Sequence, residues 1–570
     1  MNDQRSFEVV FVFVLIAVNL AVFLPSMQGD FIWDDRFFVS ENPNLLGPHF
    51  LQRFLTSPFG GYSGLDENSV QLDRAIQFYR PLTSLSYWID LKIWGLNPAG
   101  FHLTNILIQI LNCILLYFVV SSLGAGKPTA LLSALLFSVF PLHFENVSWI
   151  SGRTDLLSFL FAMLSILFFA KFFKKYRKSF LLWSSFFYLC SLLAKETNLF
   201  LPAIYFLVLY QKEPKIKEAF RWASPFLAGL LIWFVLRRIA LGTTSIGYSG
   251  RTVPDFLAAI GFYTFKIVFP FDLSVTVEAY HIFKQVAFQF LGGLMTLAFI
   301  LSTALILKKS TKLRPATFLI FSFYVLLLPS AAVIFSSWTI SLMAWRFLYL
   351  LSALFVAALV YLALTKINWK TAAIGGLGIL AVFYALEIYP KNRLYGHNET
   401  DFWMGIKDVG REDIIARSNI GIKYLDRDEG KSLEILHAIL AEKDHPLHRM
   451  WEIRIYEELA EYYTFKRDFA KAEEYFNFLF KLQRYQSQHC YFNYADFLAL
   501  TGKVQEGERI VQEMITMFPS NHMVLNYAVR FYLLVKDYPK AVEYVKKDSA
   551  LFPNKKTLRL LKEIEELEKK

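Results

Sequence analysis

The first two thirds of the chain consist of apolar runs separated by short polar segments. A helix that crosses a bilayer needs roughly 20 mostly apolar residues, and eleven runs come near that length. These runs cover residues 8–27, 101–121, 128–143, 154–173, 180–195, 197–211, 220–240, 286–307, 316–335, 343–365 and 371–389. The pattern predicts an all-α fold in which residues 1–390 form a polytopic membrane helix bundle of about eleven spans. We expect the stretch 255–270, which would break the alternation as a full span, to be re-entrant or interfacial.

Four basic runs lie between the apolar segments, at residues 171–178, 212–217, 308–314 and 366–370. If the apolar segments alternate in direction, all four runs face the same side of the membrane. Cytoplasmic loops of membrane proteins carry an excess of Lys and Arg. The pattern therefore predicts a cytoplasmic N-terminus, an extracytoplasmic C-terminus and a first extracytoplasmic loop at residues 28–98.

The C-terminal third is charged, aromatic and internally repetitive. Residues 467–475 (RDFAKAEEY) are echoed by residues 536–544 (KDYPKAVEY), and small residues and prolines recur at a similar step. A period of 34 residues resembles tetratricopeptide repeats, which stack helical hairpins into an α-solenoid. We expect residues 391–411 to be a linker and residues 412–570 to form the repeats. Such an array commonly offers a concave surface to a peptide or protein, although a spacer or an oligomerisation element is the alternative.

Composition supports a membrane protein and argues against nucleic-acid binding. Hydrophobic residues make up 55% of the chain, and the mean hydropathy is +0.37. The net charge of +11 comes from clusters between apolar segments, as topology signals do, so we expect no nucleic-acid partner. Cys113, Cys190 and Cys490 have no metal-binding or disulfide spacing. A short chain with few cysteines favours a bacterial cytoplasmic (inner) membrane. No small-residue cleavage site is obvious after the first apolar run, so we expect this run to stay as an uncleaved first span.

Two adjacent carboxylates, Asp34 and Asp35, follow the first span directly. A carboxylate at the membrane surface suits general-base catalysis on an acceptor hydroxyl. The pair could equally hold a divalent cation, Mg²⁺ or Mn²⁺, against a phosphate. The alternative is an acidic turn solvated at the interface.

Further polar residues fall on the same predicted face. Arg80 closes the first loop and would suit a lipid phosphate, which a guanidinium binds through two hydrogen bonds, although snorkelling at the headgroups is the alternative. His102 enters the second span, and His143 with Glu145 follows the third. Charged residues at membrane depth are rare and tend to be functional. His143 and Glu145 could bind a metal or the acceptor.

Three more segments add charges at this face. Arg153 and Asp155 open the fourth span and could bind substrate or pair with each other. Lys195 and Glu196 follow the fifth span, where a local ion pair is the alternative. Arg346 opens the tenth span and needs a partner, for which a phosphate is one candidate.

Six short motifs follow one another in order on this face. They are Trp33-Asp34-Asp35, Tyr79 to Thr83, Trp94 to Pro98 with Phe101-His102, Pro141 to Glu145, Ser151 to Asp155, and Ala194 to Thr197. The set resembles the GT-C class of membrane glycosyltransferases. It is most similar to the transmembrane O-mannosyltransferases that carry tetratricopeptide repeats, and protein O-mannosyltransferases are more distant relatives.

The resemblance implies an inverting enzyme that transfers a sugar from a polyprenyl phosphate to a hydroxyl, such as that of a protein Ser or Thr held by the repeats. It places the catalytic base on Asp34 or Asp35. It assigns the donor phosphate to Arg80, Arg153, Lys195 and Arg346, and it leaves His102, His143, Glu145, Asp155 and Glu196 as candidate substrate or metal ligands. One position departs from the family, which often has an acidic residue where Trp345 precedes Arg346.

Two other functions fit part of the pattern. A transporter or flippase would place polar residues in the middle of its spans, whereas here they concentrate at one face. A non-catalytic membrane scaffold that displays the repeats would tolerate changes of the loop acids. The sequence favours the glycosyltransferase.

Overall fold

The computed structural model consists of helices and turns, with no strand among the residues that it describes. The described residues are 2–40, 42–47, 49–59, 78–212, 215–242, 250–277, 279–307, 315–335, 342–367, 369–406, 413–443, 448–481, 488–519, 522–551, 560–561, 563–564 and 566. The chain divides into two compact units. Unit 1 contains residues 1–35 and 78–406, and unit 2 contains residues 36–77 and 407–570.

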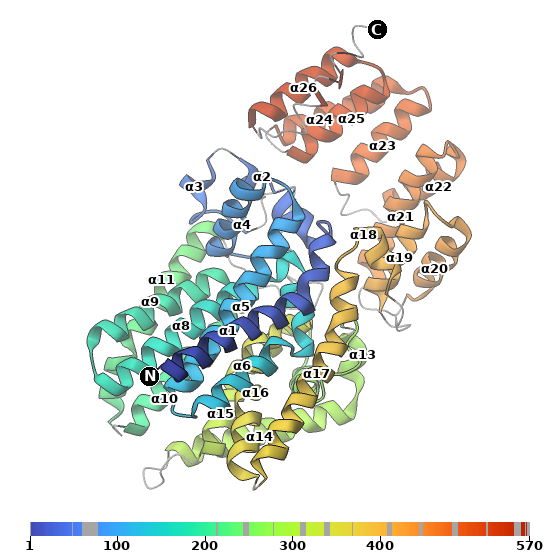
Figure 1. Cartoon of the computed structure of the whole chain (residues 1–570). Coiled ribbons are helices and arrows are strands. Elements are labelled where there is room, and N and C mark those ends of the chain that lie inside the picture. The colour runs from blue at the N-terminus through green and yellow to red at the C-terminus, as the bar shows by residue number, and fades with distance from the viewer. Residues whose placement is uncertain are drawn as a thin grey trace. The chain divides into compact units, whose positions relative to one another are not determined.

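Eight helical segments of unit 1 are long and apolar enough to cross a membrane, counted over the described residues (Figure 1). They are formed by α1 (Asn2–Phe23) with η1 (Leu24–Gln28), α5 (Pro98–Ser122), α8 (Arg153–Lys175), α11 (Ile216–Leu241), α14 (Val286–Leu307), α15 (Pro315–Ala332), α16 (Tyr349–Lys366) and α17 (Lys370–Leu394). The polytopic helix bundle predicted from the sequence is thereby confirmed.

The remaining apolar runs form shorter helices, which is why the count falls below eleven. Helix α6 (Lys127–Ser138) continues, after a bend of 49°, into the short helices η4 (Pro141–His143) and α7 (Phe144–Val147), and the bent pair could make a ninth span. Helices α9 (Lys178–Ala194) and α10 (Leu201–Lys212) have 17 and 12 residues. Both are short because the polar turn η6 (Glu196–Asn198) separates them.

The stretch predicted to be re-entrant or interfacial forms α12 (Val253–Val268), which packs directly on α14. A capping box between Thr252 and Asp255 starts this helix. A Cβ atom on Gly261 would collide with the Phe288 carbonyl oxygen, and one on Gly292 would collide with that of Leu257. Small residues thus allow the two backbones to touch, as is common between membrane helices. Helix α12 is not one of the eight candidate spans, and its position in the membrane stays a prediction.

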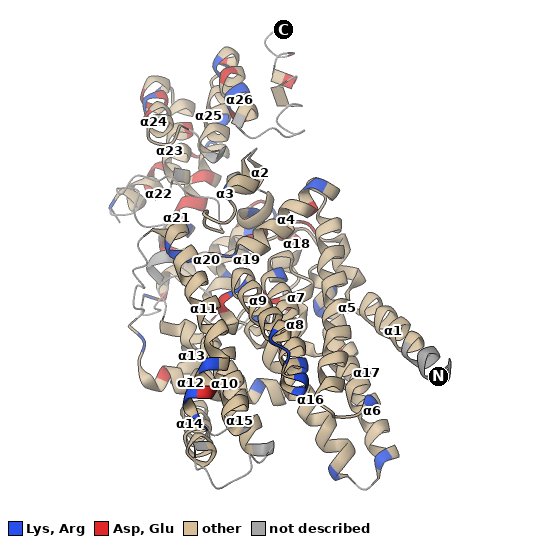
Figure 2. Cartoon of the chain, turned by 90° about the vertical axis from the view of Figure 1, so that its left-hand side faces the viewer, with Lys and Arg blue, Asp and Glu red and all other residues tan. Residues whose placement is uncertain are grey.

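Basic residues of unit 1 gather at helix ends, as Figure 2 shows. The run 171–178 joins α8 to α9, and the run 366–370 joins α16 to α17. The run 212–217 includes the last residue of α10 and the first two residues of α11, and its residues 213 and 214 lie outside the described residues. The fourth run, 308–314, lies outside the described residues.

The described residues of unit 2 form four helical hairpins. They are α19 (Ile414–Tyr424) with α20 (Glu429–Ala441), α21 (His448–Phe465) with α22 (Phe469–Lys481), α23 (Gln488–Leu500) with α24 (Val504–Met517), and α25 (His522–Leu534) with α26 (Tyr538–Leu551). The first helices of successive hairpins contact one another. Gly507 lies where α24 meets α23, and a Cβ atom there would be 2.7 Å from the Ala495 carbonyl oxygen. The hairpins suit the tetratricopeptide class, and that assignment stays a prediction.

Residues 391–406 belong to unit 1, although the sequence predicted a linker from residue 391. Helix α17 continues to Leu394, and α18 (Glu399–Met404) follows after one turn. Phe402 and Trp403 are completely buried. The burial of these aromatic side chains makes this segment part of unit 1. The hydrophilic residues around them led the sequence analysis to predict a linker instead.

Candidate active site

The two adjacent aspartates occupy different environments. Asp35 is completely buried, and its carboxylate accepts hydrogen bonds from the Ser151 amide (2.8 Å), the Ser151 hydroxyl and the Ile32 amide (3.2 Å). Burial raises the pKa of Asp35 to about 8, although these hydrogen bonds oppose the shift. Asp35 therefore fastens the loop after α1 to the short helix η5 (Ile150–Gly152).

Asp34 is partly exposed, and its carboxylate has no hydrogen-bond or ion-pair partner among the described residues. Enclosure by the protein raises the pKa of Asp34 to about 6. The charge of Arg346 lowers this pKa, that of Glu145 raises it and that of Arg80 lowers it. Asp34 is thus an unengaged carboxylate within the electrostatic reach of two guanidinium groups.

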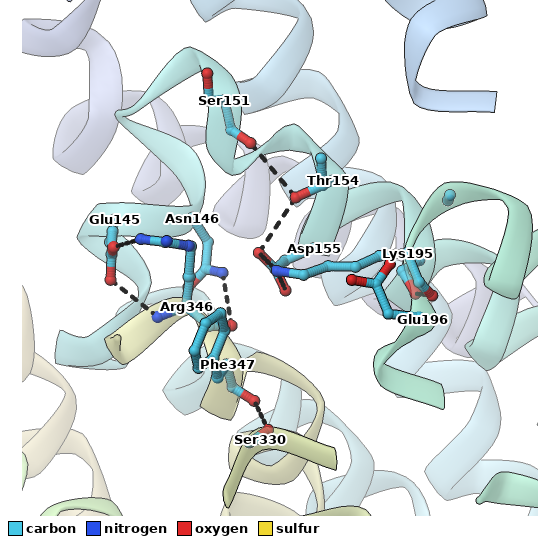
Figure 3. A network of polar contacts seen from close by, with 12 residues as sticks. Glu145, Asn146, Ser151, Thr154, Asp155, Lys195, Glu196, Ser330, Arg346 and Phe347 are labelled. Carbon is cyan, nitrogen blue, oxygen red and sulfur yellow. Dashed lines mark hydrogen bonds and ion pairs between the residues drawn. The ribbon is translucent and has the colours of Figure 1, made fainter. Parts of the chain in front are cut away.

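Arg346 is held by a carboxylate from a distant part of the chain. It lies on η8 (Trp345–Leu348), where its backbone amide donates to Glu145 Oε2 (3.0 Å) and its guanidinium donates to Oε1 (Figure 3). The guanidinium also lies 5.0 Å from the centre of the Trp149 ring. Glu145 therefore supplies the carboxylate that Trp345 does not, and Trp345 is instead buried, with its indole donating to the Ser274 carbonyl (2.7 Å).

Two more cations at this face are paired with carboxylates. The Lys195 ammonium lies 2.6 Å from both oxygens of Asp155 (Figure 3). Arg80 donates to Glu196 through Nη2 (2.6 Å) and Nε (3.2 Å). Burial lowers the pKa of Lys195 below its usual range, and the charge of Asp155 opposes that shift. The local pairs considered from the sequence, Arg153 with Asp155 and Lys195 with Glu196, are replaced by these longer-range pairs.

Arg153 differs from the other three predicted phosphate ligands. It is completely buried, and it forms an ion pair with Asp90 (2.6 Å). It also donates to Asn105 Oδ1 (2.7 Å) and to the Phe101 carbonyl (2.8 Å), and it lies over the Tyr87 ring. These contacts join α4 (Pro81–Trp94), α5 and α8, so Arg153 is a structural residue and has no surface to offer a phosphate.

The two candidate histidines are buried, and neither takes part in the ion pairs. His143 Nε2 lies 2.8 Å from the Ser352 hydroxyl, within a cluster of aromatic rings. The His102 side chain is 1% exposed. Across the described residues, no group of three or more His, Cys, Asp and Glu is placed to hold a metal ion. A role for Mg²⁺ or Mn²⁺ stays a prediction.

The charged residues that face one another form a single electrostatic cluster. It consists of three acid–base pairs (Arg80 with Glu196, Lys195 with Asp155, Arg346 with Glu145) and the unpaired Asp34. Arg346 interacts with Asp34 and with Asp155, and Lys195 interacts with Arg80 and with Arg346. Such a cluster can bind an anion by sharing its cations and can take up a proton at Asp34.

A pocket beside this cluster in unit 1 is lined by both polar and apolar side chains. Its lining consists of Asp155, Phe159, Thr197, Asn198, Leu326, Ser330, Arg346, Phe347, Tyr349, Leu350 and Leu351. The apolar side chains come from α8, α15, η8 and the start of α16. The lining therefore brings a guanidinium and a carboxylate close to apolar side chains.

Three tryptophans pack together near the site, and of these only Trp33 is part of a motif noted in the sequence. Trp33 stacks on Trp149, with ring centres 5.3 Å apart, and meets the edge of Trp403 at 5.5 Å. The one available signal was the Phe402-Trp403 pair, since two large aromatic residues are unusual in a solvated linker.

Comparison with known proteins supports the resemblance. Residues 80–237 match a family model described as dolichyl-phosphate-mannose-protein mannosyltransferase. The chain is 32% identical over 186 residues to protein O-mannosyl-transferase TMTC1 of Homo sapiens, a match that covers 30% of this chain and 20% of that protein. It is 35% identical over 179 residues to protein O-mannosyl-transferase TMTC4 of Homo sapiens, covering 29% and 23%.

The matched part therefore amounts to about a fifth of the length of these relatives. Within the family model lie Arg80, Asp155, Lys195 and Glu196, which form two of the three ion pairs of the site. Asp34 and Arg346 lie outside it. The resemblance predicted from the motifs is confirmed for this part of the chain.

Proposed function

We propose that the chain is a membrane glycosyltransferase that transfers a sugar from a polyprenyl-phosphate donor to a hydroxyl group of a protein, such as that of Ser or Thr. The observation that carries the proposal is the unengaged carboxylate of Asp34, whose pKa is raised by enclosure and which is within the electrostatic influence of the cations Arg346 and Arg80. The relatives named protein O-mannosyl-transferase support the same class of reaction.

The donor phosphate is assigned to Arg80, Lys195 and Arg346. Negative charge grows on this phosphate as its bond to the sugar breaks, so cations that are already in place lower the barrier. In the absence of donor, each cation is neutralised by its own carboxylate, which keeps three charges stable in an enclosed site.

Asp34 acts as the general base in this proposal. It accepts the proton of the acceptor hydroxyl while the hydroxyl oxygen bonds to the anomeric carbon. The bond from that carbon to the phosphate oxygen breaks at the same time, and its electron pair leaves with the phosphate. Attack opposite to the leaving phosphate inverts the anomeric centre. The proton on Asp34 then passes to water.

The site and unit 2 are assigned to the extracytoplasmic side of a bacterial inner membrane. The helix ends that carry the basic runs 171–178 and 366–370 alternate along the chain with the loops that carry the site. Because cytoplasmic loops carry an excess of basic residues, this alternation supports the extracytoplasmic assignment of the site. The hairpins of unit 2 are assigned to holding the protein acceptor, because such arrays present extended binding surfaces.

The test compares Asp34→Asn with Asp30→Asn, a change at an exposed acid four residues earlier in the same loop. Purified variants receive radiolabelled polyprenyl-phosphate sugars and cell-envelope proteins. We expect Asp34→Asn to lower transfer by about 100-fold or more, as loss of a general base does, at an unchanged thermal midpoint. Asp30→Asn should retain full activity. Full transfer by Asp34→Asn would end the assignment of Asp34 as the base, whereas absence of transfer by the unchanged chain would favour a non-catalytic scaffold.

A further inference from the structure

The backbone immediately before Asp34 adopts an unusual conformation. Trp33 has a φ of +51°, in the left-handed region that bulky residues rarely occupy. Such a conformation persists only when its surroundings enforce it, and it is often found next to functional groups. Because Trp33 and Asp34 share a peptide bond, whatever fixes Trp33 also fixes the direction in which Asp34 leaves the backbone.

Two buried indoles and one carboxylate hold Trp33. Its ring stacks on Trp149 with an interplanar angle of 23°, and Trp403 meets it edge-on at 65°. Trp149 is 2% exposed and Trp403 is 0% exposed. The Trp33 amide donates to Glu399 Oε1 at 3.4 Å. Glu399 and Trp403 both lie on α18, so a single short helix contributes two of the three contacts.

The segment that carries α18 is fixed to the loop after α1 by a close backbone crossing. A Cβ atom on Gly29 would collide with the Tyr395 carbonyl oxygen, and a Cβ atom on Gly396 would collide with that of Pro25. The buried Asn392 donates to the Val22 carbonyl at 2.9 Å and accepts from the Ser148 hydroxyl at 2.8 Å. The end of α17 therefore cannot shift without moving the loop that bears Asp34.

The other side of the aromatic cluster leads to the phosphate-binding part of the site. Trp149, which stacks on Trp33, also lies beneath the guanidinium of Arg346. Ser151, two residues further on, donates two of the three hydrogen bonds that fasten Asp35. The rings of Trp403, Trp33 and Trp149 thus pack in a continuous row. This row extends from the residue before the proposed base, Asp34, to the proposed phosphate ligand Arg346.

We infer that residues 395–404 form a strut that positions the catalytic loop, with Trp403 as the positioning residue for Asp34. Trp403 touches neither reacting group, and it acts through Trp33. This inference rests on the proposed role of Asp34 and adds to it a function for a segment that lies beyond the last span. Without the strut, Trp33 leaves the left-handed conformation and Asp34 turns away from Arg346.

The test uses the full-length chain with Trp403→Ala, Trp403→Phe and the control Trp369→Ala, which removes an indole that is 78% exposed at the start of α17. We expect Trp403→Ala to lower kcat by about tenfold or more, since small misplacement of a catalytic group has large effects. KM for the donor should stay within about twofold, because no phosphate ligand is lost. Trp403→Phe should restore most of kcat, and Trp369→Ala should leave it unchanged.

Two further readouts separate positioning from loss of fold. The acidic limb of the kcat–pH profile reports the pKa of Asp34, and it should move in Trp403→Ala because the surroundings of the carboxylate change. The near-ultraviolet circular dichroism of the stacked Trp33 and Trp149 should decrease in the same variant. If Trp403→Ala does not fold, Glu399→Ala takes its place, since it removes the acceptor of the Trp33 amide. The same shift of the acidic limb is expected for Glu399→Ala, and an unchanged limb would contradict the strut.

The possible failures are distinct. If Trp403→Ala keeps the kcat, pH profile and dichroism of the unchanged chain while Asp34→Asn is inactive, the strut is wrong and the proposed function stands. If Asp34→Asn is fully active, the assignment of the base is wrong whatever Trp403 does.

Discussion

Asp34 and Asp35 show how two identical side chains, one peptide bond apart, take different roles. Asp35 has its oxygens engaged by Ser151 and by the Ile32 amide, so moving it would break several hydrogen bonds at once. Asp34 has no such bonds within the described part of the chain, and its raised pKa makes it a better proton acceptor than an ordinary aspartate. The buried residue holds the loop, and the free residue is available for chemistry.

The pH dependence of transfer follows from the pKa of Asp34. Its base form is the deprotonated carboxylate, and enclosure raises the pKa to about 6. We expect kcat to be constant above that pH and to fall about tenfold per pH unit below it. Measurement of kcat between about pH 4.5 and 7.5, at saturating donor, checks this. A rate that stays flat down to the ordinary pKa of an aspartate would contradict the raised value.

Substitution of two arginines by lysine should separate a phosphate ligand from a structural ion pair. Lysine keeps the charge but loses the planar, bidentate geometry. We expect Arg346→Lys to lower kcat by about 10- to 100-fold, with a small change in thermal midpoint. Arg153→Lys should mainly destabilise the fold, by about 3 kcal/mol or more, because it breaks the buried contacts with Asp90 and Asn105.

Activity assays and thermal unfolding of both variants in detergent provide the comparison. The folded fraction of Arg153→Lys should retain most of its activity. Equal effects of the two substitutions on both measurements would show that Arg346 is also a structural residue.

At the scale of elements, small residues decide how closely helices pack. Helices α12 and α14 cross where Gly261 and Gly292 face the opposite backbone. The next residue, Gly293, has nothing within 4 Å of the position that a Cβ atom would occupy. Adjacent glycines in one helix therefore have opposite significance, because only one of them faces α12.

Alanine substitution at the two glycines tests this crossing. Gly292→Ala should lower the thermal midpoint, since the added methyl group would collide with the Leu257 backbone and force the helices apart. Gly293→Ala should be neutral or stabilising by up to about 1 kcal/mol, because alanine has the higher helix propensity. Thermal unfolding of the two variants under identical detergent conditions provides the comparison. If Gly293→Ala lowers the thermal midpoint as much as Gly292→Ala does, the described packing of α12 on α14 is wrong.

The sequence predicts elements well where a single run of residues determines them. Length and hydropathy locate α5, α8 and α16, and charges in order along the chain locate the site face. The ion pairs are not predictable in this way, because Arg346 and Glu145 are 201 residues apart and only tertiary packing brings them together. The same holds for Trp403, whose burial depends on Trp33, at the other end of unit 1.

At the scale of the whole molecule, the chain passes between its two units next to the site. It leaves unit 1 directly after Asp35 and returns at Phe78, two residues before Arg80. It leaves again after Ile406, at the end of the segment that carries Trp403. The part of the chain assigned to the acceptor is therefore joined covalently to the loops assigned to catalysis. A change of sequence in unit 2 can affect transfer to a protein without touching the donor site.

The membrane orientation gives a decisive prediction for the whole molecule. In a chain whose three free cysteines are replaced, single cysteines at Lys174 and Lys431 report the two sides. Both lysines are exposed, the first at the end of α8 and the second in α20 of unit 2. With intact spheroplasts, a membrane-impermeant maleimide should label Lys431→Cys and leave Lys174→Cys unlabelled, and permeabilisation should expose both. The reverse labelling would place the site in the cytoplasm and would overturn the extracytoplasmic assignment.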